Sequence, residues 1–154
     1  MEKREREDVA WYWAVLFGAY LGVLFYLLFF SEEYGRTMGE RGYRYNLELF
    51  KEIKRFWGNW ETIGIKNVMI NLAGNVAAFA PFGFFAPMYF RWAKNIFGCT
   101  FVTALFSLLV EAIQLVSKVG AFDVDDIVLN AAGGFVGFLC YFILLGRRNK
   151  EKKK

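Results

Sequence analysis

The sequence contains no histidine, only two cysteines and only two prolines among its 154 residues. Without histidine, catalytic sites of the Ser-His-Asp and Cys-His kinds and histidine-based metal centres are excluded. Cys99 and Cys140 lie in separate apolar segments and lack the spacing of a redox or metal-binding pair. We therefore expect no disulfide, no metal site and no cofactor.

Charge is also missing from long stretches of the chain, although 22% of the residues are charged. The charged residues crowd into 1–8, 31–66 and 147–154, whereas a soluble helical protein carries charge on one face of each helix. A bilayer core needs about 20 apolar residues in a helix. Four segments meet this length, at about residues 9–30, 68–89, 96–117 and 124–145. The sequence predicts an all-α integral membrane protein with four transmembrane helices, forming a single domain over residues 1–154.

Lysine and arginine predict the orientation of these spans. Four spans place both termini on one side, and the segments on that side hold eleven basic residues against eight on the other. Six of the eleven lie in the basic tail, residues 146–154, whereas the long loop 31–66 also carries six glutamates. The positive-inside rule therefore predicts cytoplasmic N- and C-termini and an outer loop 31–66. A basic tail directly after a span is typical of contact with anionic lipid, so we expect the lipid bilayer and no nucleic acid as partner.

Apolar residues in the outer loop recur at intervals of three or four. They are Leu47, Phe50, Ile53, Trp57 and Trp60, within the segment 46–60. This spacing predicts one face of an amphipathic helix. Such a helix, with two tryptophans, either lies in the outer interface or packs as a short helix over the ends of the spans.

Polar side chains share faces of three spans, near their predicted outer ends. The candidate ligand-binding residues are Asn71 and Asn75 in the second span, Glu111 and Gln114 with Lys118 beyond them in the third, and Asp126 and Asn130 with Asp123 before them in the fourth. Within each span they are three or four residues apart and so lie on one face. At 1.5 Å rise per residue, Asn71 and Asn75 lie about 4–11 Å from the outer end of their span, and Glu111 and Asn130 lie about 9 Å from theirs.

Carboxylates in this position require an explanation, because a carboxylate in hydrocarbon costs several kcal/mol unless it is paired, protonated or hydrated. For the amides, hydrogen bonds that join the helices explain the pattern as well as a ligand does. For Glu111 and Asp126 a functional cavity is the better explanation, because amides alone would join helices at lower cost. We interpret Asp123, Asp125 and Asp126 as solvated residues at a helix start, where negative charge is favourable.

Small residues and prolines predict how the spans pack. Gly133, Gly134 and Gly137 form a small face that is typical of closely packed helices. Pro81 and Pro87 are expected to kink or end the second span.

Three segments together resemble the VanZ-like family of bacterial membrane proteins. They are NLAGNVAAFAPFGFFAP (71–87), EAIQL (111–115) and FDVDDIVLNAAGGFVG (122–137). The matching positions are Asn71, Gly74, Asn75, Phe79, Pro81 and Gly83 in the first, Glu111 and Gln114 in the second, and Phe122, Asp123, Asp126, Asn130, Gly133 and Gly137 in the third. The resemblance covers about residues 45–140 in the family's order and spacing. One position departs from the pattern, because Ala121 stands where many members carry an arginine, and Lys118 is the nearest base.

The resemblance implies a bacterial cell-membrane protein associated with tolerance to teicoplanin-type glycopeptide antibiotics. Our leading hypothesis is a binding or protective module whose polar cavity holds an outer-leaflet amphiphile, such as a lipid-linked cell-wall precursor or a lipoglycopeptide. An intramembrane enzyme is the alternative, with Glu111 and Asp126 as acid and base, or with a divalent cation on the aspartates and Glu111 meeting a pyrophosphate. A small transporter is a third possibility, disfavoured because the other halves of the spans lack polar residues.

Overall fold

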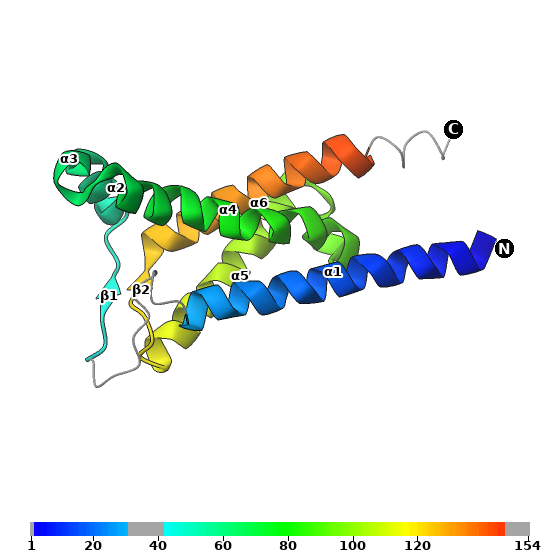
Figure 1. The fold of residues 1–154 in the computed structure, drawn as a ribbon, viewed down its shortest axis with the longest axis horizontal. Coiled ribbons are helices and arrows are strands. Elements are labelled where there is room, and N and C mark those ends of the chain that lie inside the picture. Colours follow the sequence, from blue (N-terminus) through cyan, green and yellow to red (C-terminus); the bar gives the residue numbers. More distant parts are fainter. Residues whose placement is uncertain (1, 31–41, 147–154) are drawn as a thin grey trace. The chain divides into compact units, whose positions relative to one another are not determined.

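The fold consists almost entirely of helices (Figure 1), in a computed structural model that describes residues 2–30 and 42–146. The start of the outer loop and the basic tail used to predict the orientation lie outside the described residues. The chain divides into two units, Met1–Arg36 and Thr37–Lys154. The first contains α1 (Glu2–Phe30), which includes the uncharged run predicted as the first span.

Within the described residues, four helices are long and apolar enough to cross a bilayer. Their apolar spans are Trp11–Phe29 in α1, Ile65–Tyr89 (α4), Ile96–Val116 (α5), and Val124–Leu145, which comprises α6 (Val124–Tyr141) and most of a π-helical turn (Phe142–Gly146). Their mean hydropathy lies between 1.5 and 2.1. The prediction of four spans is confirmed, with α4 beginning at Ile65 rather than near residue 68. The protein is therefore a multi-pass membrane protein.

In the second unit, α6 packs closely against α4 and α5 because its glycines let the backbones approach. A Cβ at Gly133 would collide with the carbonyl oxygen of Val76, and a Cβ at Gly137 would collide with that of Ala80, both in α4. A Cβ at Gly134 would collide with the Thr103 side chain of α5. The small face predicted from these glycines is thus confirmed as a packing surface.

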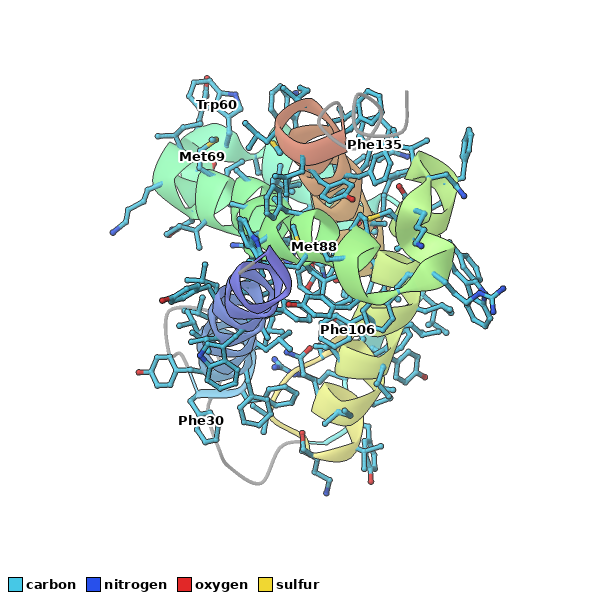
Figure 2. The ribbon with its side chains drawn as sticks, turned by 90° about the vertical axis from the view of Figure 1, so that its right-hand side faces the viewer. Phe30, Trp60, Met69, Met88, Phe106 and Phe135 are labelled. Carbon is cyan, nitrogen blue, oxygen red and sulfur yellow. The ribbon has the colours of Figure 1, made fainter. Side chains whose placement is uncertain are left out.

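The helix α5 buries most of its polar side chains and exposes many of its apolar ones. Ser107 and Gln114 are fully buried, whereas Phe97 is 85% exposed and Phe101 61% exposed. This helix also makes aromatic contacts, since Phe106, which Figure 2 labels, stacks on Phe82 of α4 with ring centroids 4.5 Å apart. Outward apolar and inward polar faces suit a helix surrounded by lipid, where buried polar groups hydrogen-bond between helices.

The helix α4 continues through Pro81 and Pro87 and ends at Tyr89, so neither proline ends the span at its own position, and the expected kink stays a prediction. A proline removes the N–H that would bond the carbonyl four residues earlier, which for Pro87 is the carbonyl of Gly83. The thiol of Cys99 in α5 donates to this carbonyl oxygen at 3.3 Å. A neighbouring helix therefore satisfies the acceptor that the proline frees. A 3-10 turn (Arg91–Lys94) then leads into α5.

The segment between α1 and α4 is only partly the helix expected from its periodicity. Residues Tyr45–Asn46 form β1, which pairs in parallel with β2 (Phe122–Asp123). The helix begins at Lys51 rather than near residue 46, as α2 (Lys51–Gly58), and α3 (Trp60–Ile63) follows after a break at Asn59. Leu47 accordingly lies outside the helix and is 66% exposed.

Candidate ligand-binding site at the polar end

Polar side chains gather where α4 and α6 begin and α5 ends, a region that we call the polar end. The helix α2 contacts both α4 and α6 there. Of the predicted site residues, Asn75, Glu111, Gln114 and Asn130 are buried in this region, whereas Asn71 and Lys118 are exposed. The three spans therefore bring most of the predicted residues to one end of the second unit.

Asp125 joins the start of α6 to the start of α2. It is only 1% exposed, and its carboxylate accepts hydrogen bonds from the backbone N–H groups of Phe50, Glu52 (2.8 Å) and Ile53 (3.2 Å). Phe50 itself provides no side-chain cap for α2. Asp125 thus supplies from another helix the acceptor that the first free N–H groups of a helix require. The interpretation of Asp125 as a solvated residue is wrong.

A second set of bonds holds the corner between α5 and α6. The carboxylate of Glu111 accepts from the backbone N–H of Asp123 at 3.0 Å, and Glu111 is 2% exposed. Asp123 caps α6 by accepting from the N–H of Asp125 at 2.9 Å, and it also accepts from the Asn46 amide at 3.1 Å. Glu111 therefore positions the start of α6, and Asn46 ties β1 to the same corner.

Two further hydrogen bonds join the spans below this corner. The Asn75 amide in α4 donates to the Asp126 carboxylate in α6 at 2.6 Å. The Asn130 amide in α6 donates to the Ser107 hydroxyl in α5 at 2.8 Å, and both residues are buried. These contacts are of the kind expected for amides that join helices.

A polar cavity of about 120 Å³ opens beside these bonds. Its lining residues come from α2, α4, β2 and α6, and they are Glu52, Ile53, Phe56, Asn71, Leu72, Asp123, Asp125, Asp126 and Leu129. Three of the predicted residues, Asn71, Asp123 and Asp126, thus line one cavity. Glu111, Gln114, Asn130 and Lys118 are not among its lining residues.

The polar cavity carries strong negative charge. Four of its lining residues are carboxylates, and none of the lining residues is a lysine or arginine. At its rim, Arg55 pairs with Glu52 at 2.9 Å. Burial raises the pKa of the Asp123 carboxyl, and repulsion from Asp125 and Glu52 adds to this, while the hydrogen bonds from the Asp125 N–H and Asn46 oppose it. The cavity therefore favours cationic or hydrogen-bond-donating groups and disfavours phosphate.

Lys118, the expected substitute for the arginine missing at Ala121, lies elsewhere. It adopts a left-handed backbone conformation with φ 58, and its ammonium group sits 5.1 Å from the ring centroid of Tyr43. Within residues 11–30 and 42–145, whose side chains are described, no three carboxylates or thiols converge closely enough to hold a metal ion. The arrangement with a divalent cation on the aspartates and Glu111 thus has no ligand set in this part of the chain.

Sequence reasoning missed the roles of Asn46, Glu52, Asp125 and Ser107 at the polar end. Asp125 and Glu52 carry no signal of their own, since their roles depend on where α2 meets α6. Ser107 did carry a signal, because it lies four residues before Glu111 and four after Thr103, on one polar stripe of α5.

The amino-acid sequence matches a known protein family. The family model described as VanZ/LLP1 matches residues 17–145. Protein VanZ of Enterococcus faecium is 35% identical over 78 residues, which cover 51% of this chain and 48% of that protein. The matched region thus spans about half the length of this curated relative. No solved structure is significantly similar to the chain.

Proposed function

Since this chain belongs to the VanZ/LLP1 family, we propose that it raises tolerance to teicoplanin-type glycopeptides by binding an amphiphile at its polar end. The candidate ligands are a lipoglycopeptide and a lipid-linked cell-wall precursor in the outer leaflet of a bacterial cell membrane, and the negative charge of the cavity favours the lipoglycopeptide over a phosphate-bearing precursor. The observation that carries the proposal is the cavity in which Asn71, Asp123 and Asp126 meet, at an end of the spans that α2 and α3 adjoin. A carboxylate-lined cavity at membrane depth needs a polar or cationic occupant or water.

The susceptibility of a Gram-positive host to teicoplanin tests this proposal. Asn71 lines the cavity, and among the described residues its amide donates to the Asn67 carbonyl of its own helix at 2.9 Å, so we expect Asn71→Leu to keep the fold. Asn67→Leu is the matched control, because Asn67 makes the same bond one turn earlier, to Ile63, and does not line the cavity. We expect the intact chain and Asn67→Leu to raise tolerance and Asn71→Leu to lose it at equal membrane abundance.

Two results contradict the proposal. If the host is equally susceptible with and without the chain, the antibiotic function is wrong for this protein. If Asn71→Leu protects as well as the intact chain, the polar cavity is not the working part. Glu111→Ala is a poorer variant, because removing the acceptor for the Asp123 N–H disturbs the corner between α5 and α6.

The proposal requires that the polar end faces outward, with both termini in the cytoplasm. In a Cys99→Ser, Cys140→Ser background, Lys51→Cys at the start of α2 should react with a membrane-impermeant maleimide added to intact cells. Lys94→Cys, in the turn at the opposite end of α4, should react only after permeabilisation. Both original lysines are exposed, so accessibility within the protein does not limit the reaction. The reverse labelling pattern would contradict an outer-leaflet ligand.

A further inference from the structure

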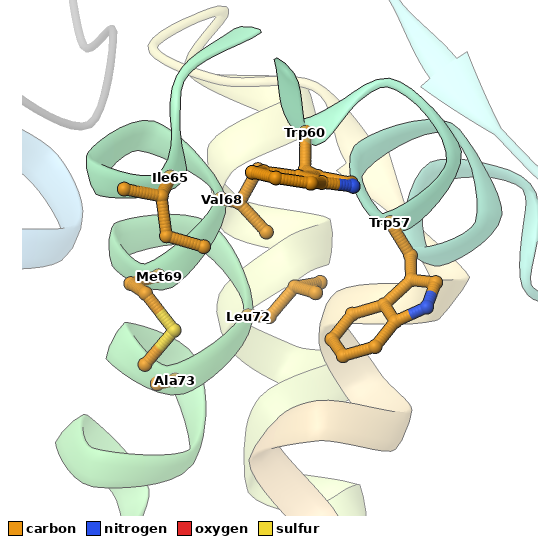
Figure 3. Close-up of a pocket in the computed structure, with 7 residues that line it drawn as sticks. All are labelled: Trp57, Trp60, Ile65, Val68, Met69, Leu72 and Ala73. Atoms are coloured by element: carbon orange, nitrogen blue, oxygen red, sulfur yellow. The ribbon is translucent and has the colours of Figure 1, made fainter.

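An apolar groove of about 380 Å³ lies next to the polar cavity. Trp57 of α2 and Trp60 of α3 flank it, and one face of α4 forms its wall through Ile65, Val68, Met69, Leu72 and Ala73 (Figure 3). No charged side chain lines it. Leu72 lines both the groove and the polar cavity, so the two spaces adjoin at this side chain.

The groove and the cavity differ sharply in chemistry. Trp57 and Trp60 are 73% and 49% exposed, and Met69 is 54% exposed, so a large apolar surface is open beside the start of α4. On the other side of Leu72 stand Glu52, Asp123, Asp125 and Asp126. A ligand that occupies both spaces must therefore be apolar at one end and complementary to carboxylates at the other.

We propose that the groove holds the alkyl chain of an amphiphile whose protonated amine enters the polar cavity. This inference rests on the proposed function, because it assumes that the polar end binds an amphiphile, and it specifies the chemical class. Charge complementarity selects the amine, since a phosphate or pyrophosphate would meet four carboxylates and no lining cation. An amphiphile with an amine near its alkyl chain fits the groove and the cavity together, and one with phosphate next to the chain does not.

Part of the negative charge is already engaged by the protein. The Asp125 carboxylate is surrounded by N–H groups of α2, and Asp126 accepts from Asn75. Glu52 has a 25% exposed side chain and is paired only at the rim, with Arg55. The preference for an amine can therefore be tested through the carboxylates of Glu52, Asp123 and Asp126. Glu52 is the best of them for this test.

Tryptophan fluorescence measures binding in the groove directly. In the full chain, Trp11, Trp13 and Trp92 are replaced by phenylalanine, which leaves Trp57 and Trp60 of the five tryptophans. The protein, in nanodiscs of zwitterionic lipid, is titrated with an alkylammonium, an alkylphosphate and a neutral alkyl glycoside that carry bromine on the same chain. We expect saturable quenching, with the alkylammonium bound about tenfold more tightly than the alkylphosphate.

Two pairs of variants locate the binding. Ala73→Phe fills the groove and should weaken the binding measured by quenching about tenfold. Ala77 is also exposed, one turn further along α4, but does not line the groove, so Ala77→Phe should leave binding unchanged. Glu52→Gln should reduce the preference for the alkylammonium. Glu48→Gln should not, although Glu48 forms the same kind of pair with Lys51, because it does not line the cavity.

Several results would overturn the inference. These are quenching that never saturates, alkylphosphate binding as tight as alkylammonium binding, or equal effects of Ala73→Phe and Ala77→Phe. If these appear while Asn71→Leu still abolishes teicoplanin tolerance, this inference fails alone and the proposed function stands. If the binding pattern is as expected but the chain gives no tolerance, the ligand class stands and the antibiotic function fails.

Discussion

Removing the Asp125 carboxylate should detach α2 from the polar end without unfolding the spans. This carboxylate is the acceptor for three N–H groups at the start of α2, in a helix of 8 residues that has no buried side chain of its own. A hydrogen bond to a charged group contributes about 1.5–3 kcal/mol, and loss of a helix cap costs about 0.5–2 kcal/mol. Asp125→Asn keeps one acceptor oxygen but loses the charge, so we expect α2 to be destabilised by about 2 kcal/mol.

Amide hydrogen exchange in detergent or nanodiscs measures this effect. A loss of about 2 kcal/mol raises the open population of α2 about 30-fold, and the exchange of its amides rises by the same factor. The amides of α5 should exchange at nearly the same rate as before, because the hydrogen bonds of the Asp125 carboxylate go to α2 and not to α5. Asp126→Asn is the control, since it makes the same change one residue later in a carboxylate that accepts from Asn75 of α4. Unchanged exchange in α2, or an equal increase in α2 and α5, would refute the capping role.

Three further predictions concern the packing and the charge of the second unit. Gly137→Ala should lower the free energy of unfolding by about 1–3 kcal/mol, and with it the thermal midpoint in detergent. The reason is that the new Cβ meets the backbone carbonyl of Ala80, which cannot rotate away. Ser107→Ala leaves the buried Asn130 amide without its acceptor and should cost about 1–3 kcal/mol, whereas adding Asn130→Leu should recover part of that loss. The pKa of Asp123 is raised in the folded protein, so the folded state binds this proton more tightly than the unfolded state does. Stability should therefore fall as pH rises from 3.8 through the raised pKa, and melting curves across this range should show that Asp123→Asn removes the fall.

The spans and their packing faces could be predicted from sequence because both follow from local patterns. Long apolar runs with few charged residues define the four spans, and the glycines of α6 recur on one face that meets α4. Amides and carboxylates three or four residues apart likewise predicted that Asn75 and Asp126 would lie at one end of the bundle. Hydropathy and helical period contain this information without any knowledge of the tertiary structure.

The path of the segment before α4 could not be predicted in the same way. Its apolar spacing is helical from residue 46, but Asn46 pairs with Asp123, and this long-range contact prevents the helix from starting before Lys51. The continuation of α4 past Pro87 has the same origin, since a thiol of another helix satisfies the freed carbonyl. In both places a partner distant in sequence decides the local structure.

The carboxylates of the polar end divide into two groups, and this division determines how loss-of-function variants can be interpreted. Glu111 and Asp125 accept from backbone N–H groups and hold elements together, so substituting either one disturbs the fold as well as the charge. Glu52 forms its only described side-chain bonds at the exposed rim, with Arg55. A loss of activity in a Glu111 variant is thus compatible with any function that needs an intact polar end. A loss in Glu52→Gln, with Glu48→Gln unaffected, requires that the charge of the cavity itself contacts the ligand.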